Sequence, residues 1–145
     1  MLVNSSLLKL VTLLNDQHIY VQLSALKSLG LITEEVPEVF LKHEKCLEIL
    51  DFVIKMNKND HFLKYICKIV DNLSQARVSN NVLSPHAGDL AKIFIDILLN
   101  REKSLQVVSN CFNTAINLIK CSQNVGLSNQ YLDFVLKAFP DIAPL

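Results

Sequence analysis

The stretch DHFLKYICKIVDNLSQA, residues 60–76, contains the pattern around which the rest of the chain is organised. Its apolar residues follow one another at the intervals of a single helix face, with polar residues between them. These apolar residues are Phe62, Leu63, Ile66, Ile69, Val70 and Leu73. The stretch therefore predicts an amphipathic helix that buries one broad face.

Related stretches lie on both sides of this helix and align with it in columns. The segment ICKIVDN at residues 66–72 aligns with ALKSLGL at residues 25–31 and with CFNTAIN at residues 111–117, with spacings of 41 and 45 residues. A second set of segments, LLKLVTLLN, ILDFVIKMN and KIFIDILLN, ends at Asn15, Asn57 and Asn100, with spacings of 42 and 43. Repetition at about 40–47 residues is typical of solenoids built from helical repeats.

Composition favours helices throughout the chain. Half of the 145 residues are hydrophobic, and the chain has only three glycines and four prolines. Few residues that favour tight turns are therefore available for β-hairpins. The chain also sustains no alternation of apolar and polar residues, which is the pattern of a β-strand. We therefore predict an all-α fold, namely a solenoid of about three helical repeats. A non-repetitive helical bundle is the alternative, because bundles also join amphipathic helices by short loops.

The expected helices divide the chain into repeats within a single domain of residues 1–145. We expect helices at residues 7–14, 18–33, 37–43, 46–56, 60–76, 85–99, 101–121 and 129–139. The first is expected to be capped within residues 4–6 and the fifth by Asp60, while Pro37 suits a first helical turn. The repeat units are then about 1–33, 34–76 and 77–122, and residues 123–145 form a C-terminal capping helix or the start of a further repeat.

Charge and hydropathy disfavour several classes of partner. Fourteen basic residues balance fourteen acidic ones, so no overall field attracts nucleic acid. No run of 18 or more apolar residues could insert into a membrane. No apolar stretch follows a basic start, so a signal peptide is not expected and the predicted location is cytoplasmic or nuclear.

Motifs for catalysis or cofactors are missing from the sequence. His43 and Cys46 are the only close pair of metal-ligand type, and no second pair stands at ligand spacing. No glycine-rich phosphate loop or nucleophile elbow is present. We therefore predict a protein that is not an enzyme and binds no cofactor or metal. The four cysteines are expected to be reduced, buried thiols.

The order of the elements resembles a known family. A short helix, a longer helix, a polar turn and a long third helix ending in Asn-Leu are similar to armadillo repeats. The segments VQLSALKSLGLIT at residues 21–33 and DNLSQA at residues 71–76 look most like third helices of importin-α and β-catenin. HEAT repeats are a close neighbour and stay open. The resemblance covers nearly the whole chain and implies a right-handed α-solenoid.

In that family the third helices form a concave groove in which asparagines hold the backbone of an extended peptide. The resemblance places Leu31, Asn72 and Asn117 in this asparagine column. An amide suits the task because it both donates and accepts hydrogen bonds. Alternatively, Asn72 and Asn117 bond a neighbouring loop, as asparagines near helix ends often do.

The column that holds tryptophan in importin-α is different here. It contains Lys27, Lys68 and Asn113, and the chain has no tryptophan. Tryptophan faces grip lysine stems of basic peptides, so their replacement argues against a receptor for basic signals. Two lysines in equivalent positions instead favour an acidic or phosphorylated ligand. Alternatively, they are ordinary solvated surface charges.

The leading hypothesis is a non-enzymatic scaffold that binds an extended peptide or partner protein on the concave third-helix surface. Its binding residues are then Lys27, Leu31, Lys68, Asn72, Asn113 and Asn117. The alternatives are an adaptor fragment similar to nuclear-transport receptors and a structural piece that self-associates through exposed end helices. Joint replacement of Lys68 and Asn72 is expected to weaken partner binding with little effect on thermal stability.

Overall fold

The computed structural model describes residues 2–57, 59–76, 82–100 and 104–122, together with Asn129 and Asp133. Within these residues the chain forms helices and no strand, which confirms the all-α prediction. The helices are α1 (Leu2–Leu14), α2 (Ile19–Glu35), α3 (Pro37–Lys42), α4 (Cys46–Ile54), α5 (Asp60–Gln75), α7 (Ser84–Asn100) and α8 (Leu105–Ser122).

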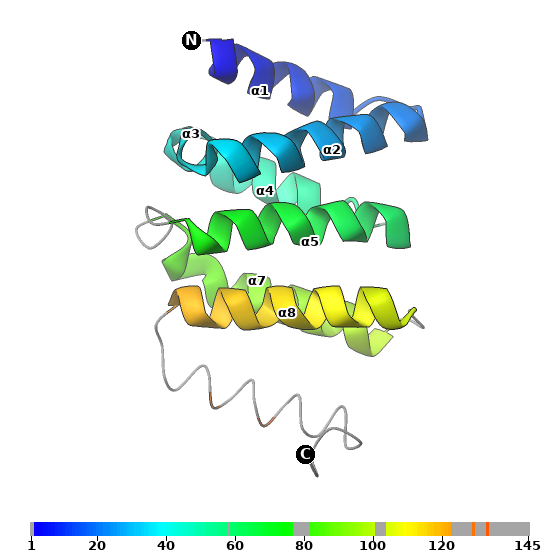
Figure 1. The fold of residues 1–145 in the computed structure, drawn as a ribbon, viewed down its shortest axis with the longest axis vertical. Coiled ribbons are helices and arrows are strands. Elements are labelled where there is room, and N and C mark those ends of the chain that lie inside the picture. The colour runs from blue at the N-terminus through cyan, green and yellow to red at the C-terminus, as the bar shows by residue number, and fades with distance from the viewer. Residues whose placement is uncertain are drawn as a thin grey trace.

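Four helices lie side by side in a row. Figure 1 shows α1, α2, α5 and α8 one below another and roughly parallel, with α3, α4 and α7 on the far side. Helix α2 packs against α1 and α5, and α8 packs against α5 and α7. The three aligned segments therefore belong to α2, α5 and α8, which are consecutive members of the row.

Helix α5 has the apolar face that its sequence predicts. All six apolar residues of the expected face are buried, and Cys67 is buried with them. They join a hydrophobic cluster to which every helix of the row contributes, with Phe40, Phe62 and Phe94 among its largest fully buried side chains. The first residues of the aligned segments, Ala25, Ile66 and Cys111, all lie in this cluster. Each large apolar side chain buried in this way contributes about 1.5–3 kcal/mol.

Some helix ends differ from the expected ones. Helix α1 begins at Leu2, so residues 4–6 lie inside it and do not cap it. Helix α2 runs two residues beyond Thr33, whose buried hydroxyl donates to the carbonyl oxygen of Leu29 at 2.9 Å. Bonding back to the preceding turn satisfies the hydroxyl, so this threonine does not stop the helix. Pro37 stands in the first turn of α3 as predicted.

The cap of α5 is Asn59 and not Asp60, which corrects the expectation from sequence. The Oδ1 atom of Asn59 accepts a hydrogen bond from the backbone N–H of Phe62 at 3.0 Å. Asn59 has an extended backbone, whereas Asp60 is the first helical residue. Only a residue with non-helical dihedrals can fold its side chain back onto the first free N–H groups.

Several predicted features fall outside the described residues. These are residues 77–81 of the third repeat unit, residues 101–103 of the helix expected at 101–121, residues 123–128 and the final helix at 129–139, apart from Asn129 and Asp133. Within the described part, Leu83 is buried. None of the helices in this part combines the length and apolar character needed to cross a bilayer.

The Asn59 cap gives a direct test of the local structure. Asn59→Ala should lower the free energy of unfolding by about 1 kcal/mol, because the N–H of Phe62 loses its acceptor. Asn59→Ser and Asn59→Asp should restore most of the loss, since both side chains accept in the same position. Urea denaturation of the variants measures the difference. An alanine variant as stable as the parent would contradict the assignment.

Candidate protein-binding surface

The residues predicted to bind a partner come from the three aligned helices. Helix α2 carries Lys27 and Leu31, α5 carries Lys68 and Asn72, and α8 carries Asn113 and Asn117. Lys27, Leu31, Lys68 and Asn113 are exposed, whereas Asn72 and Asn117 are half-buried. The exposed residues along one side of these helices define what we call the row surface: Tyr20, Ser24, Lys27 and Leu31 of α2, His61, Lys64 and Lys68 of α5, and Gln106, Ser109, Asn113 and Ile116 of α8.

Asn72 connects α5 to α2. Its Nδ2 atom donates to the backbone carbonyl of Gly30 at 3.2 Å and to the hydroxyl of Thr33 at 3.1 Å. An amide nitrogen has two hydrogens, so both are used within the protein. The carbonyl oxygen Oδ1 is the part of Asn72 that is left for a ligand.

Asn117 makes the equivalent connection one helix further along the row. Its Nδ2 atom donates to Oδ1 of Asp71 at 3.1 Å. Asp71 directly precedes Asn72, just as Gly30 directly precedes Leu31, so both asparagines reach back to the same position of the preceding helix. The asparagine column thus joins neighbouring helices, in agreement with the alternative that asparagines bond nearby protein groups.

The lysines of the row surface have different surroundings. Lys68 forms an ion pair with Glu34 at 3.4 Å, but both side chains are about half exposed, so this pair contributes little stability. The Nζ atoms of Lys27 and Lys64 lie 5.9 and 5.7 Å from the centre of the Tyr65 ring. An ammonium group at this distance from an aromatic ring is weakly attracted to its face.

A groove of about 450 Å³ opens between α5 and α8. Of the predicted site residues, only Lys68 and Asn72 line it. The other lining residues are Lys64, Tyr65, Cys67, Asp71, Gln106 and Asn110. Sequence columns missed Lys64 and Tyr65 because their equivalents on α2 are Leu23 and Ser24. A search for exposed positions on the helical wheel of α5 would have found Lys64 beside Lys68.

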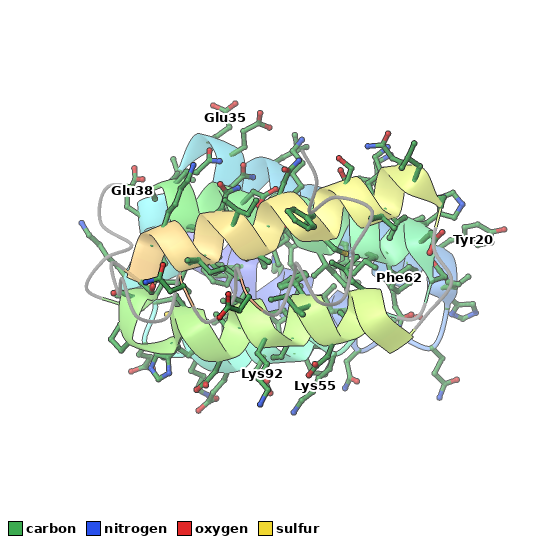
Figure 2. The ribbon with its side chains drawn as sticks, turned by 90° about the horizontal axis from the view of Figure 1, so that it is seen from below. Tyr20, Glu35, Glu38, Lys55, Phe62 and Lys92 are labelled. Carbon is green, nitrogen blue, oxygen red and sulfur yellow. The ribbon has the colours of Figure 1, made fainter. Side chains whose placement is uncertain are left out.

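A second hollow of about 310 Å³ lies between α1 and α2 and is mainly apolar. Leu10, Leu13, Tyr20, Val21 and Ala25 line it, together with two serines. Tyr20 is 80% exposed and projects from the edge of the molecule in Figure 2. Leu8 and Leu13 of α1 are also exposed, so this end of the row presents apolar side chains to solvent.

Asp71 is the acidic side chain of the groove. Burial raises the pKa of its carboxyl above the ordinary value of 3.8, and the hydrogen bond from Asn117 opposes this shift. Loss of hydration disfavours the carboxylate, whereas a donated hydrogen bond favours it. Asp71 therefore lies between α5 and α8, where the hydrogen bond donated by Asn117 offsets part of the cost of burying the carboxylate.

The cysteines are buried thiols, as predicted. The Sγ atoms of Cys67 and Cys111 lie 3.8 Å apart across the contact between α5 and α8. This hydrogen-bonded contact, together with burial, raises the pKa of the Cys67 thiol well above its ordinary value. Among the described residues, no group of three or more histidine, cysteine, aspartate or glutamate side chains could hold a metal ion.

Comparison with known proteins found no matching family model, no similar curated protein and no similar solved structure.

The structure revises the expected effect of replacing Asn72. Asn72→Ala should lower the free energy of unfolding by about 1–3 kcal/mol, because the carbonyl of Gly30 and the hydroxyl of Thr33 lose a donor at a helix contact. Asn72→Asp should be at least as unstable, since a carboxylate cannot donate. Asn113→Ala is the matched control and should change stability by less than about 0.5 kcal/mol, because Asn113 is exposed. Equal urea midpoints for the two alanine variants would contradict this role.

The raised pKa of Asp71 predicts a pH-dependent stability difference. Between 3.8 and its higher folded-state pKa, the folded chain binds more protons at this site than the unfolded chain. This site therefore lowers the free energy of unfolding as the pH rises through that window. Asp71→Asn cannot titrate and still offers an oxygen to Asn117, so it should gain stability relative to the parent from acid to neutral pH. A constant difference, measured by urea denaturation at each pH, would contradict the assignment.

Proposed function

We propose that the chain is a right-handed α-solenoid of three armadillo-like or HEAT-like repeats that binds an extended segment of a partner protein on the row surface. In this proposal the protein is a non-enzymatic interaction module. The repeats correspond to residues 1–33, 34–76 and 77–122, and the place of action is the cytoplasm or nucleus.

The equivalent contacts of Asn72 and Asn117 are the observation that carries the proposal. Both amides reach the residue that precedes the asparagine column on the neighbouring helix, over sequence separations of 42 and 46 residues. Two unrelated helix pairs have no reason to share this contact, whereas successive copies of one unit repeat it. The side-by-side order of α2, α5 and α8 in Figure 1 supports the same interpretation.

The chemistry of the row surface suits a peptide. A helix row leaves a long surface, and the groove between α5 and α8 offers ammonium groups from Lys64 and Lys68 and amides from Gln106 and Asn110. Amides and ammonium groups satisfy the carbonyls and polar side chains of an extended chain. Cys67 and Asp71, whose pKa values are raised, are instead engaged with α8, which favours a structural role for both.

Site-specific crosslinking tests the proposal. A photoreactive phenylalanine analogue introduced at Lys68 or Asn113 should crosslink a partner protein in cells that naturally produce this chain. The same group at Lys92 should not, because Lys92 lies on the α7 side of the molecule, away from α8 (Figure 2). Equal crosslinking from all three positions, or crosslinking from Lys92 alone, would remove the row surface from the proposal.

A further inference from the structure

At its α2 end the row surface borders an apolar hollow through Tyr20 and Ser24, and further along it carries lysines. The hollow between α1 and α2 is lined mainly by apolar side chains, among them Leu10, Leu13 and Val21. Its size admits a large apolar side chain. Burial of such a side chain contributes binding free energy in proportion to the apolar area removed from water.

The next contact along the row is basic. Lys27 of α2 and Lys64 of α5 both approach the ring of Tyr65. Among the described residues, neither ammonium group has a carboxylate within ion-pair distance, whereas Lys68 is paired with Glu34. Two positive charges near one aromatic ring and without counter-charges attract an anionic group.

Two acidic side chains near this cluster are already engaged. Glu34 is held by Lys68 at 3.4 Å, and the carboxylate of Asp71 accepts a hydrogen bond from Asn117 on the α8 side. An acidic residue of a ligand is therefore directed towards Lys27 and Lys64. A lysine ammonium binds an anion as a point charge, and a carboxylate is the anionic group that an unmodified peptide side chain supplies.

The order of the helices sets the distance between the two features. The apolar hollow lies between α1 and α2, the lysine pair bridges α2 and α5, and the groove with Lys64 and Lys68 lies between α5 and α8. Packed helices are about 8–10 Å apart. A distance of one to two helix spacings is spanned by roughly three to six residues of extended chain at ~3.3 Å per residue.

We propose that the segment bound on the row surface is an extended acidic peptide in which a large apolar residue precedes or follows glutamate or aspartate residues by about three to six positions. The apolar residue enters the hollow between α1 and α2, and the carboxylates contact Lys27 and Lys64. This inference rests on the proposed function and adds the chemistry of the partner.

Selection from a random peptide library tests the inference. Peptides of about 12 residues can span both features at ~3.3 Å per residue, and they are selected on the immobilised chain. The enriched peptides should combine an apolar residue with acidic residues at the stated spacing. Raising the ionic strength from about 0.1 M to about 1 M should weaken binding, because the Debye length falls from about 10 Å to about 3 Å.

Variants of the chain locate the two contacts. The double variant Lys27→Glu/Lys64→Glu should weaken binding of an enriched peptide by at least about tenfold, which corresponds to about 1.4 kcal/mol. Ser24→Phe should remove the preference for the apolar residue, since Ser24 is exposed and lines the hollow. Lys92→Glu is a charge-reversal control on the α7 side and should bind like the parent. Circular dichroism confirms that each variant is folded.

The outcomes separate this inference from the proposed function. Enriched peptides that lack acidic residues, or that bind the Lys27→Glu/Lys64→Glu variant as tightly as the parent, would overturn the inference while the row surface still binds peptides. If a concentration-dependent dimer, detected by light scattering, occupies the hollow and Ser24→Phe abolishes it, a second copy and not a peptide is the occupant. If no peptide is enriched, the proposed function fails with the inference.

Discussion

The burial of α5 between α2 and α8 is the constraint on which the rest of the structure depends. A 16-residue helix is only marginally stable alone in water, so its stability comes from neighbours that cover its apolar side chains. Helix α5 is covered by α2 and α8, and these helices need the same cover from α1 and α7. Each helix of the row in Figure 1 therefore buries its apolar face against its neighbours.

Hydrophobic contacts alone do not fix how far one helix slides along another, because they have no direction. The polar contacts supply that direction. Asn72 can donate to the carbonyl of Gly30 and the hydroxyl of Thr33 only at one position along the axis of α2. In the same way, Asn117 can donate to the carboxylate of Asp71 only at one position along α5. These bonds contribute modest free energy, but a shift by one turn would leave half-buried amides without partners. They select one register among the arrangements that burial allows.

The helices and the buried face of α5 could be predicted because their signal is local. Apolar spacing marks residues 62–73 as a helix face, and the columns around Ala25, Ile66 and Cys111 mark three buried positions. The partners of Asn72 could not be predicted, since one is the backbone carbonyl of Gly30, a group that every residue has.

The Asn59 cap was missed because Asn and Asp are both good caps, and only the backbone dihedrals decide between adjacent candidates. The Tyr65 cluster and the groove depend on how α2, α5 and α8 meet, which no single helix encodes.

In the proposed complex, the position of the asparagines also limits how a partner backbone can bind. Asn72 uses both amide hydrogens within the protein, and no hydrogen bond to its Oδ1 atom is found among the described residues. It can therefore accept from a ligand N–H but cannot donate to a ligand carbonyl unless the contact with α2 breaks. In the proposed complex, the carbonyls of a bound chain must then find donors elsewhere, and the exposed Asn113 amide and the Lys64 ammonium group offer such donors on the row surface. At the other end, Leu31 occupies the asparagine position and is 58% exposed, so it offers an apolar contact in place of an amide. In the asparagine column, the proposed surface therefore offers an apolar side chain at α2 and amides at α5 and α8.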